Sequence, residues 1–182
     1  MKIYTKTGDK GGTSLLGKRV RKDCLEIKVL GDIDELNGSL GVLASGLQNS
    51  KFKNEIKKII NIQHNLFVIG SNVASLDLDA GKVPKLKEDD ISELENWIDE
   101  MEQGLDPLYD FILPGGDVAA AQSFLTRAVC RRCERSLVLL KDEHNELDSL
   151  IAQYLNRLSD VLFVLARWLN KKNEIKDVIW KK

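Results

Sequence analysis

The sequence has few of the residues that would mark an unusual class of protein. Its three cysteines, Cys24, Cys130 and Cys133, do not have the number or spacing of a disulfide framework, which indicates a reducing compartment. No apolar run reaches membrane-spanning length, and the first residues lack the apolar core of a signal peptide. The net charge of −1 excludes a general attraction to nucleic acid or to an anionic membrane. We therefore expect a cytoplasmic protein whose partners are small molecules or copies of itself.

Two common kinds of site are also missing from the sequence. Neither His64 nor His144 belongs to a Glu-x-x-His pair, which argues against a ferritin-like carboxylate metal protein. Cys130-Arg-Arg-Cys133 matches Cys-x-x-Cys, but it has no second cysteine pair and its surroundings are helical. Structural thiols are therefore favoured over a redox or metal role.

Helical periodicity is what the chain has in abundance, because apolar residues recur every three or four positions. The pattern predicts helices over about Asp32 to Leu47, Lys53 to Leu76, Ile91 to Leu105, the run after Gly116, and Glu146 to Asn170. In the second helix, Ile60 and Phe67 are expected to widen the buried face. With no convincing sheet, we expect an all-α, five-helix up-and-down bundle. It forms one domain over residues 1–182, with an N-terminal loop segment over 1–25 and a C-terminal tail over 171–182.

The first segment, from Tyr4 to Arg19, has no helical period and is rich in Gly, Thr and Lys. Its glycines let the backbone approach a ligand, and its amides and hydroxyls can donate to phosphate oxygens, so it has the chemistry of a phosphate cradle. Its second half approaches a P-loop, but Arg19 stands where a magnesium-binding Ser or Thr is required. An ordinary P-loop is therefore excluded. The alternative is a mobile polar terminus.

The most unusual stretch is Phe111-Ile-Leu-Pro-Gly-Gly-Asp117 with the helix that follows it. Arg127, Arg131 and Arg135 recur every four residues, which aligns them in one stripe. A solvated basic face is the ordinary interpretation, but arginines at a break in the apolar pattern favour an anion site. Phe111 itself fits either a core position or a functional one.

Asp32 and Asp34 stand at the expected start of the first helix, where acids suit the positive end of the helix dipole. Asp34 is also a candidate partner of one of the arginines that follow Phe111. Both interpretations stay open from the sequence.

Five short motifs follow one another along nearly the whole chain. They are Tyr4-Thr-Lys-Thr-Gly-Asp-Lys-Gly-Gly-Thr13, Asp34-Glu-Leu-Asn37, Phe111-Ile-Leu-Pro-Gly-Gly116, Arg127-x-x-x-Arg131-Arg-x-Glu-Arg135 and Asn156-Arg-Leu-Ser-Asp160. Together they resemble the motifs of PduO-type ATP:cob(I)alamin adenosyltransferases, whereas residues 50–103 carry little of this resemblance. The resemblance implies a five-helix homotrimer with sites between subunits. Its activity would transfer the adenosyl group of ATP to cob(I)alamin, giving adenosylcobalamin and triphosphate.

The resemblance also implies roles for individual residues. The N-terminal residues that would hold ATP are Thr5, Lys6, Thr7, Gly8, Asp9, Gly11, Gly12, Thr13 and Lys18. The residues that would complete the nucleotide site are Arg131, Glu134, Arg135 and Asn156, with Glu134 also at Mg²⁺. Asp34 and Arg127 would pair across the subunit boundary, and Phe111 would lie beneath the corrin. The catalytic candidates are therefore Arg131, Phe111, Asp34 and Arg127.

This chemistry fits a chain without a nucleophile constellation, because cobalt(I) is itself the nucleophile. The protein would align the substrates and stabilise the charge of the leaving group. A cobalamin reductase and an adenosylcobalamin-dependent enzyme are the protein partners implied. The alternative from a different class is a trimeric carrier that delivers nucleotide or finished cofactor without catalysing the transfer.

Overall fold

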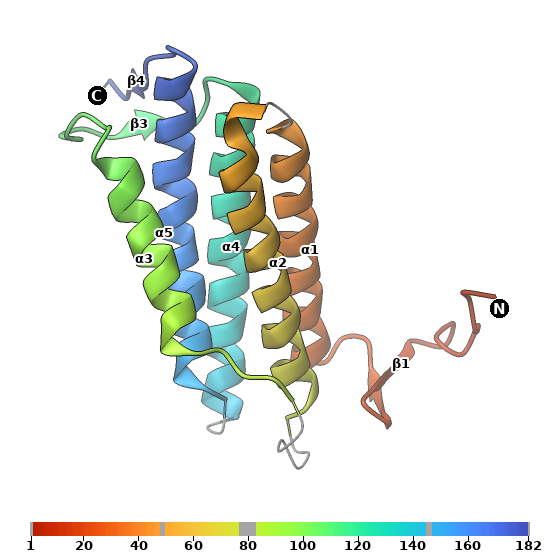
Figure 1. The fold of residues 1–182 in the computed structure, drawn as a ribbon. Helices are drawn as coiled ribbons and strands as arrows, with labels where there is room; N and C mark the ends of the chain where they lie inside the picture. The colour runs from red at the N-terminus through yellow and green to blue at the C-terminus, as the bar shows by residue number, and fades with distance from the viewer. Residues whose placement is uncertain (1, 48–49, 77–82, 145–146, 182) are drawn as a thin grey trace.

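The computed structural model is an antiparallel bundle of helices with two short strand pairs outside it (Figure 1). It describes residues 2–47, 50–76, 83–144 and 147–181. The helices are α1 (Leu25–Gly46), α2 (Lys53–Ala74), α3 (Glu88–Glu102), α4 (Val118–Glu143) and α5 (Ser149–Lys172), and the 3-10 helix η1 (Ser50–Phe52) precedes α2. The strands are β1 (Gly12–Leu15), β2 (Lys18–Arg21), β3 (Ile112–Leu113) and β4 (Val178–Ile179). The prediction of an all-α, five-helix up-and-down bundle is confirmed.

The apolar periodicity accounts for the core of the bundle. α5 packs against both α3 and α4, while α1 packs against α4 and α2. The residues expected to form the buried row of the first helix are all buried: Ile33, Leu36, Leu40, Leu43 and Leu47. Full burial of one such side chain contributes about 1.5–3 kcal/mol, so these rows supply most of the driving force for assembling the bundle. None of the helices in the described ranges is both long and apolar enough to cross a membrane.

The start of α4 is fixed by a local hydrogen bond that the sequence motif supplies. Asp117 follows the Pro-Gly-Gly turn and is the N-cap residue, and its Oδ1 accepts from the Ala119 backbone N–H at 2.9 Å. Such a cap contributes about 1 kcal/mol. The turn therefore leads directly into the helix that carries the arginines.

The first helix begins earlier than expected. α1 starts at Leu25, so Asp32 and Asp34 lie in its interior and not in its first turn. Gly31 and the two acids have the composition of a helix start, but Val29 lies one turn earlier and is fully buried, so the apolar row had already begun.

The expected core face of α2 is wrong in part. Ile60 is 44 % exposed and Phe67 is 72 % exposed. Ile62 and Ile69, two residues further along, are buried in their place. Both rows have helical spacing, and the sequence alone does not show which one faces the neighbouring helices.

Two short strand pairs accompany the helices, although the sequence predicts no convincing sheet. β1 pairs antiparallel with β2 inside the N-terminal segment, and β3 pairs antiparallel with β4, which belongs to the C-terminal tail. Strands of two to four residues leave too short a pattern to detect. The polar connection from Asp77 to Lys87 and the expected helix start at Glu146 fall partly outside the described residues, because 77–82 and 145–146 are not described.

Candidate functional site

The N-terminal arm, residues 2–24, projects sideways from the start of α1 and away from the other helices (Figure 1). Its hairpin turns at Gly17, whose φ of 91° suits a residue without a side chain. Arg19 on β2 reaches back across the hairpin, and its Nη2 donates to the carbonyl oxygens of Thr7 and of Gly12, the latter at 3.1 Å. The arginine that departs from the P-loop pattern therefore ties the loop together.

The arm places the expected ATP-binding residues of the N-terminus in one folded loop. Gly11 N–H donates to Gly8 O at 3.1 Å in a tight turn, and Lys22 N–H donates to Gly11 O at 2.9 Å across the hairpin, next to the Gly12–Arg21 pair. Beside them is a hollow lined by Lys10, Gly11, Gly12, Arg19, Val20, Arg21, Lys22 and Asp23. Cationic side chains outnumber the single acid there, which favours an anion as ligand. The loop residues from Lys6 to Lys10 are exposed, except for Gly8, which is half-buried. Lys6 has a positive φ of 59°.

A second polar cluster lies on the surface between α4 and α5. Arg131 and Arg135 are exposed on α4, and Arg135 Nη1 donates to the backbone oxygen of Arg131 at 3.1 Å. Glu134 is half-buried beside them, and its Oε1 accepts from Asn156 Nδ2 of α5 at 3.0 Å. The structure thus brings Glu134 and Asn156 into contact, with Arg131 and Arg135 exposed beside Glu134 on the same helix.

The remaining arginines of α4 have different surroundings. The guanidinium of Arg127 lies 5.4 Å from the ring centroid of Phe163 on α5, a cation–π arrangement. Arg132 instead faces α1, where it pairs with Glu35 and lies 3.4 Å from Asp32. The hydrogen bond that Arg132 donates to the Glu35 carboxylate raises the pKa of Arg132. The arginines of α4 therefore differ in their surroundings: Arg132 belongs to the α1–α4 contact, whereas Arg131 and Arg135 are exposed.

Asp34 and Arg127 are not brought together within one chain. Asp34 is exposed on α1, whereas Arg127 lies over a ring of α5, on the other neighbour of α4. In the described part of the chain, Asp32 and not Asp34 is the aspartate of this segment that pairs with an arginine of α4.

Phe111 directly precedes β3, which lies at the opposite end of the bundle from the arm (Figure 1), and it is 78 % exposed, so its interpretation as core is wrong. Its backbone oxygen accepts from Trp180 N–H at 2.7 Å, and the two rings meet edge to face with centroids 6.3 Å apart. They share a hollow of about 610 Å³ lined by Leu108, Tyr109, Asp110, Phe111, Ile179 and Trp180. The mainly aromatic and aliphatic lining suits a large, flat, partly apolar ligand.

Within one chain, the Phe111 end and the arginine cluster are far apart along α4. Thirteen residue steps separate Val118 from Arg131. At about 1.5 Å per residue, this is roughly 20 Å along the helix axis. One chain therefore presents an apolar hollow and a cationic cluster as separate surfaces.

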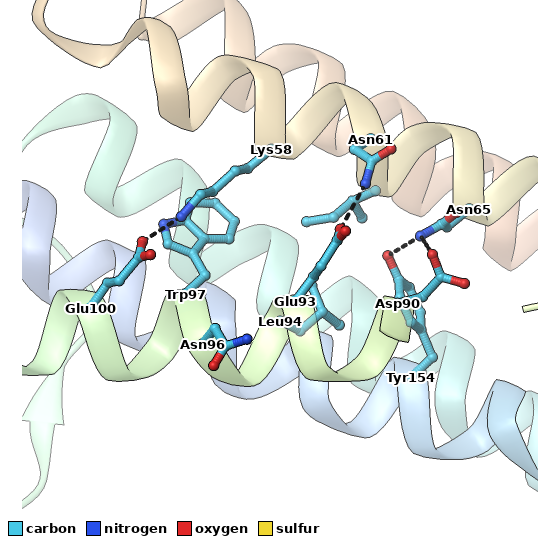
Figure 2. A pocket seen from close by; sticks show the side chains of 11 residues that line it. Lys58, Asn61, Asn65, Asp90, Glu93, Leu94, Asn96, Trp97, Glu100 and Tyr154 are labelled. Atoms are coloured by element: carbon cyan, nitrogen blue, oxygen red, sulfur yellow. Dashed lines mark hydrogen bonds and ion pairs between the residues drawn. The ribbon is translucent and has the colours of Figure 1, made fainter. Parts of the chain in front are cut away.

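A further cleft of about 210 Å³ lies between α2 and α3 (Figure 2). Side chains bridge it at three levels: Lys58–Glu100 (2.5 Å), Asn61–Glu93 (3.2 Å) and Asn65–Asp90 (3.3 Å). Asn65 also donates to the hydroxyl of Tyr154 at 3.3 Å, and burial raises the pKa of Tyr154. The cleft contains none of the expected site residues, and its polar ladder joins two helices whose backbones make little close contact.

The two cysteines of the Cys-x-x-Cys pattern are fully buried in the core. Cys130 Sγ donates to Leu155 O at 3.3 Å. Burial raises the pKa of the Cys130 thiol well above its usual range and that of Cys133 to about 12. Within the described ranges no group of three or more His, Cys, Asp or Glu side chains is arranged to hold a metal ion. The interpretation as structural thiols is supported.

Comparison with known proteins gives consistent results for sequence and structure. Residues 3–169 match a family model described as cobalamin adenosyltransferase. The chain is 42 % identical over its whole length to a cobalamin adenosyltransferase of Cupriavidus metallidurans, of which the match covers 95 %. It is 41 % identical to a corrinoid adenosyltransferase of Bacillus subtilis, with 98 % of this chain and 91 % of the relative covered. 

A solved structure is also similar over the whole chain. It is a variant of the PduO-type ATP:corrinoid adenosyltransferase from Lactobacillus reuteri, complexed with cobalamin and ATP. Its TM-score is 0.92 at 33 % identity, and the match covers 100 % of this chain and 97 % of that one. 

Proposed function

The chain belongs to the cobalamin adenosyltransferase family, and on this basis we propose how it transfers the 5′-deoxyadenosyl group of ATP to cob(I)alamin. The observation that carries the mechanism is that the predicted site residues other than Asp34 and Arg127 lie in three groups: a basic loop, the cluster of Arg131 and Arg135 with Glu134 and Asn156, and an aromatic hollow at Phe111. Each group suits one part of the two substrates. The loop and the cluster suit the triphosphate, and the hollow suits the corrin.

The reaction needs no nucleophile from the protein. Cobalt(I) provides both electrons of the new cobalt–carbon bond, and the electrons of the broken C5′–O bond leave with triphosphate. This assignment is supported by the burial of both cysteines of α4, whose raised pKa values keep them as unreactive thiols.

Stabilisation of the triphosphate is the main electrostatic task of the protein. We assign it to Arg131 and Arg135 on α4 together with the backbone amides, hydroxyls and lysines of the N-terminal loop. Arginine suits this role because its planar guanidinium donates two parallel hydrogen bonds to a phosphate. The exposure of both arginines on α4 leaves room for that contact.

Magnesium is the metal implied for such a nucleotide site, and the side chains near Arg131 fit it. Mg²⁺ is usually held by one or two carboxylates plus phosphate oxygens and water, without a dedicated protein cage. Glu134 supplies one half-buried carboxylate, and its bond to Asn156 fixes its orientation. When bound, the ion would neutralise charge on the phosphates. Glu134 is therefore our proposed protein ligand.

We propose that the active protein is a homotrimer with sites between subunits. The arm extends away from its own bundle and could place its loop on the α4–α5 surface of a neighbour (Figure 1). Asp34 belongs to an exposed stripe of α1 with Gly38 and Val42, where small residues permit close approach of another helix. Pairing of Asp34 with Arg127 of the neighbouring subunit would lock this contact. The roughly 20 Å along α4 between its first residue, Val118, and Arg131 also favours a site completed by a second chain.

We assign the lower face of the corrin to Phe111. An exposed aromatic ring in an apolar hollow would exclude water and displace the lower axial ligand of the cobalt. Loss of that ligand would make cobalt(II) easier to reduce. The chain would act as one domain over residues 1–182, in the cytoplasm, where its three free thiols stay reduced.

The deciding experiment mixes purified protein with ATP, Mg²⁺ and chemically reduced cobalamin. It follows the cobalt–carbon bond spectroscopically and triphosphate by chromatography. We expect both products in equal amounts. R131A should lower kcat at least about 100-fold, because it removes a donor to the leaving group. Cobalamin and ATP binding without triphosphate release would identify a carrier and overturn the proposed reaction, whereas unimpaired turnover of R131A would overturn only the role of Arg131.

A further inference from the structure

Asn170 lies in the last turn of α5 and is 2 % exposed, yet its side-chain amide is fully hydrogen-bonded. Its Oδ1 accepts from Asp117 N–H at 2.9 Å, at the start of α4. Its Nδ2 donates to Gly115 O and to Asp177 Oδ1, each at 3.1 Å. One amide therefore joins the Pro-Gly-Gly turn on one side to the C-terminal segment on the other.

The turn rests directly on this amide. Gly116 has a φ of 101°, and a Cβ built on it would lie 2.1 Å from Asn170 Oδ1. Only a residue without a side chain allows such an approach. The glycine and the asparagine are therefore fitted to each other.

Asp177 extends the connection to the chain that leads into Phe111. Its Oδ2 lies 3.1 Å from Arg167 Nε, in an ion pair whose side chains are only 10 % and 19 % exposed. Arg167 Nη2 in turn donates to Asp106 O at 2.8 Å. The segments before and after Phe111 are thus both fastened to the end of α5.

Phe111 depends on these fastenings because its own ring is mostly exposed. Its neighbours β3 and β4 pair through only two residues each, and Trp180 bonds to its backbone oxygen. A strand pair of this length is not stable alone in water. The position of the ring is therefore set by the residues that hold the turn and the tail.

We propose that Asn170 is the positioning residue for Phe111: it holds the turn and the tail at the spacing that presents the ring to the lower face of the corrin. This inference rests on the proposed function, since it takes Phe111 to meet the corrin. Asn170 touches no substrate and acts through Phe111. Its amide is suited to the task because it offers two donors and an acceptor where three partners converge.

Replacement by aspartate separates positioning from packing. N170D keeps the size of the side chain and an acceptor for Asp117 N–H, but it removes both donors and sets a carboxylate against Asp177. Adding D177N returns a donor across that contact, so N170D/D177N should recover part of the lost function. The matched control is N173A, which removes an asparagine one turn away whose side chain accepts from Lys51 at 2.8 Å.

Four readouts are taken on the full-length protein: the Tm, the KM for ATP, the kcat from cob(II)alamin with a reductant, and the electron paramagnetic resonance spectrum of cob(II)alamin bound with ATP. The spectrum reports whether the lower axial ligand has left the cobalt, without any turnover. For N170D we expect the ligand-free fraction and the kcat from cob(II)alamin with a reductant to fall about tenfold. The KM for ATP should stay within about twofold, because the hydrogen bonds of Asn170 go to Asp117, Gly115 and Asp177, none of which is assigned to the triphosphate. N173A should match the wild type.

An unchanged spectrum in N170D would overturn the inference. A merely structural role for Asn170 would also overturn the inference. It would be shown by a loss of function in N170D that D177N does not recover, together with a higher KM for ATP and a fall in Tm large enough to explain the inactivity. A wild-type protein that shows no adenosyl transfer would instead refute the proposed function.

Discussion

The two strand pairs of this molecule are similar in construction but differ in how they are anchored. The N-terminal pair, β1 and β2, is held by bonds within its own arm, chiefly those of Arg19 to Thr7 and Gly12. The pair at the other end, β3 and β4, is fastened through Asn170 to the end of α5. The comparison indicates that the β3–β4 pair, beside the proposed corrin site, is fixed to the bundle. The β1–β2 pair, in the proposed nucleotide loop, is held within the arm, which extends away from the bundle.

This difference matches what each end would have to do. A ring that sets the geometry of a cobalt centre must be held to within fractions of an ångström, which requires support from buried hydrogen bonds. A loop that wraps a nucleotide can order itself on its ligand or on a neighbouring chain. The predictions that follow test whether the two ends are as independent as their contacts suggest.

Removal of the arm should have the largest effect. Deleting residues 2–22 is expected to lower kcat/KM for ATP by more than about 100-fold, since it takes away a whole set of phosphate donors. The Tm of the bundle should hardly change, because the arm projects away from the other helices. Thermal melting by circular dichroism and steady-state kinetics measure the two effects. A matched deletion of residues 174–182 should lower the Tm, and equal Tm losses from both deletions would break the comparison.

Two glycines, one at each end, test the difference in anchoring by the addition of a single methyl group. Gly116 and Gly11 both have positive φ, 101° and 78°, so alanine is strained at either by about 1 kcal/mol. G116A should cost about 2–3 kcal/mol in all, because its methyl group also displaces the Asn170 amide. A methyl group at Gly11 meets nothing within 4 Å, and the backbone strain falls on the arm, which projects away from the other helices (Figure 1), so G11A should leave the unfolding of the bundle unchanged. Urea unfolding at equilibrium measures both, and similar midpoints would show that the turn is not fitted to α5.

The smallest effect concerns the bundle that both ends share. Burial raises the pKa of Cys133 from its ordinary value near 9 to about 12, so its neutral thiol is favoured in the folded state. The contribution of this thiol to the stability of the folded protein is fully present below pH 9 and is lost as the pH rises from 9 to about 12. Between neutral pH and about pH 10, the free energy of unfolding should therefore fall by about 1 kcal/mol less in C133A than in the wild type.

Urea unfolding between pH 8 and pH 11 measures this difference. The control is C24A, at the half-buried boundary between the arm and α1, which should alter the pH dependence less. If C24A and C133A have the same effect, the buried thiol does not set the alkaline limit.

The helices could be predicted from the sequence because burial imposes a period that many residues share. Ile33, Leu36 and Leu40 repeat the same spacing, and each repeat supports the next. The start of α1 was placed too late because Gly31 and Asp32 resemble a helix start. The exposed Phe67 was assigned to the core because an apolar residue facing outward looks the same in a sequence as one facing inward.

The candidate site was less accessible to sequence reasoning for a different reason. The grouping of Glu134 with Asn156 follows from motifs of a family, and the structure places the two side chains in contact. Asn170 is not predicted as important because it is a single polar residue at the expected end of a helix, and nothing in the pattern shows that it is buried with its amide hydrogen-bonded. Likewise, Phe163 gave no sign that it supports Arg127 from another helix. Contacts made by single residues have no period to detect.

α4 is unbroken from Val118 to Glu143, with the Asn170 contact near one end and the Glu134–Asn156 bond further along. Such a helix fixes both the distance between its side chains along the axis and the direction in which each one points. One inserted residue would lengthen it by only about 1.5 Å but would turn everything beyond it by about 100°. Arg131 would then face away from its present surface, so changes in chain length can be absorbed only in the connections between helices.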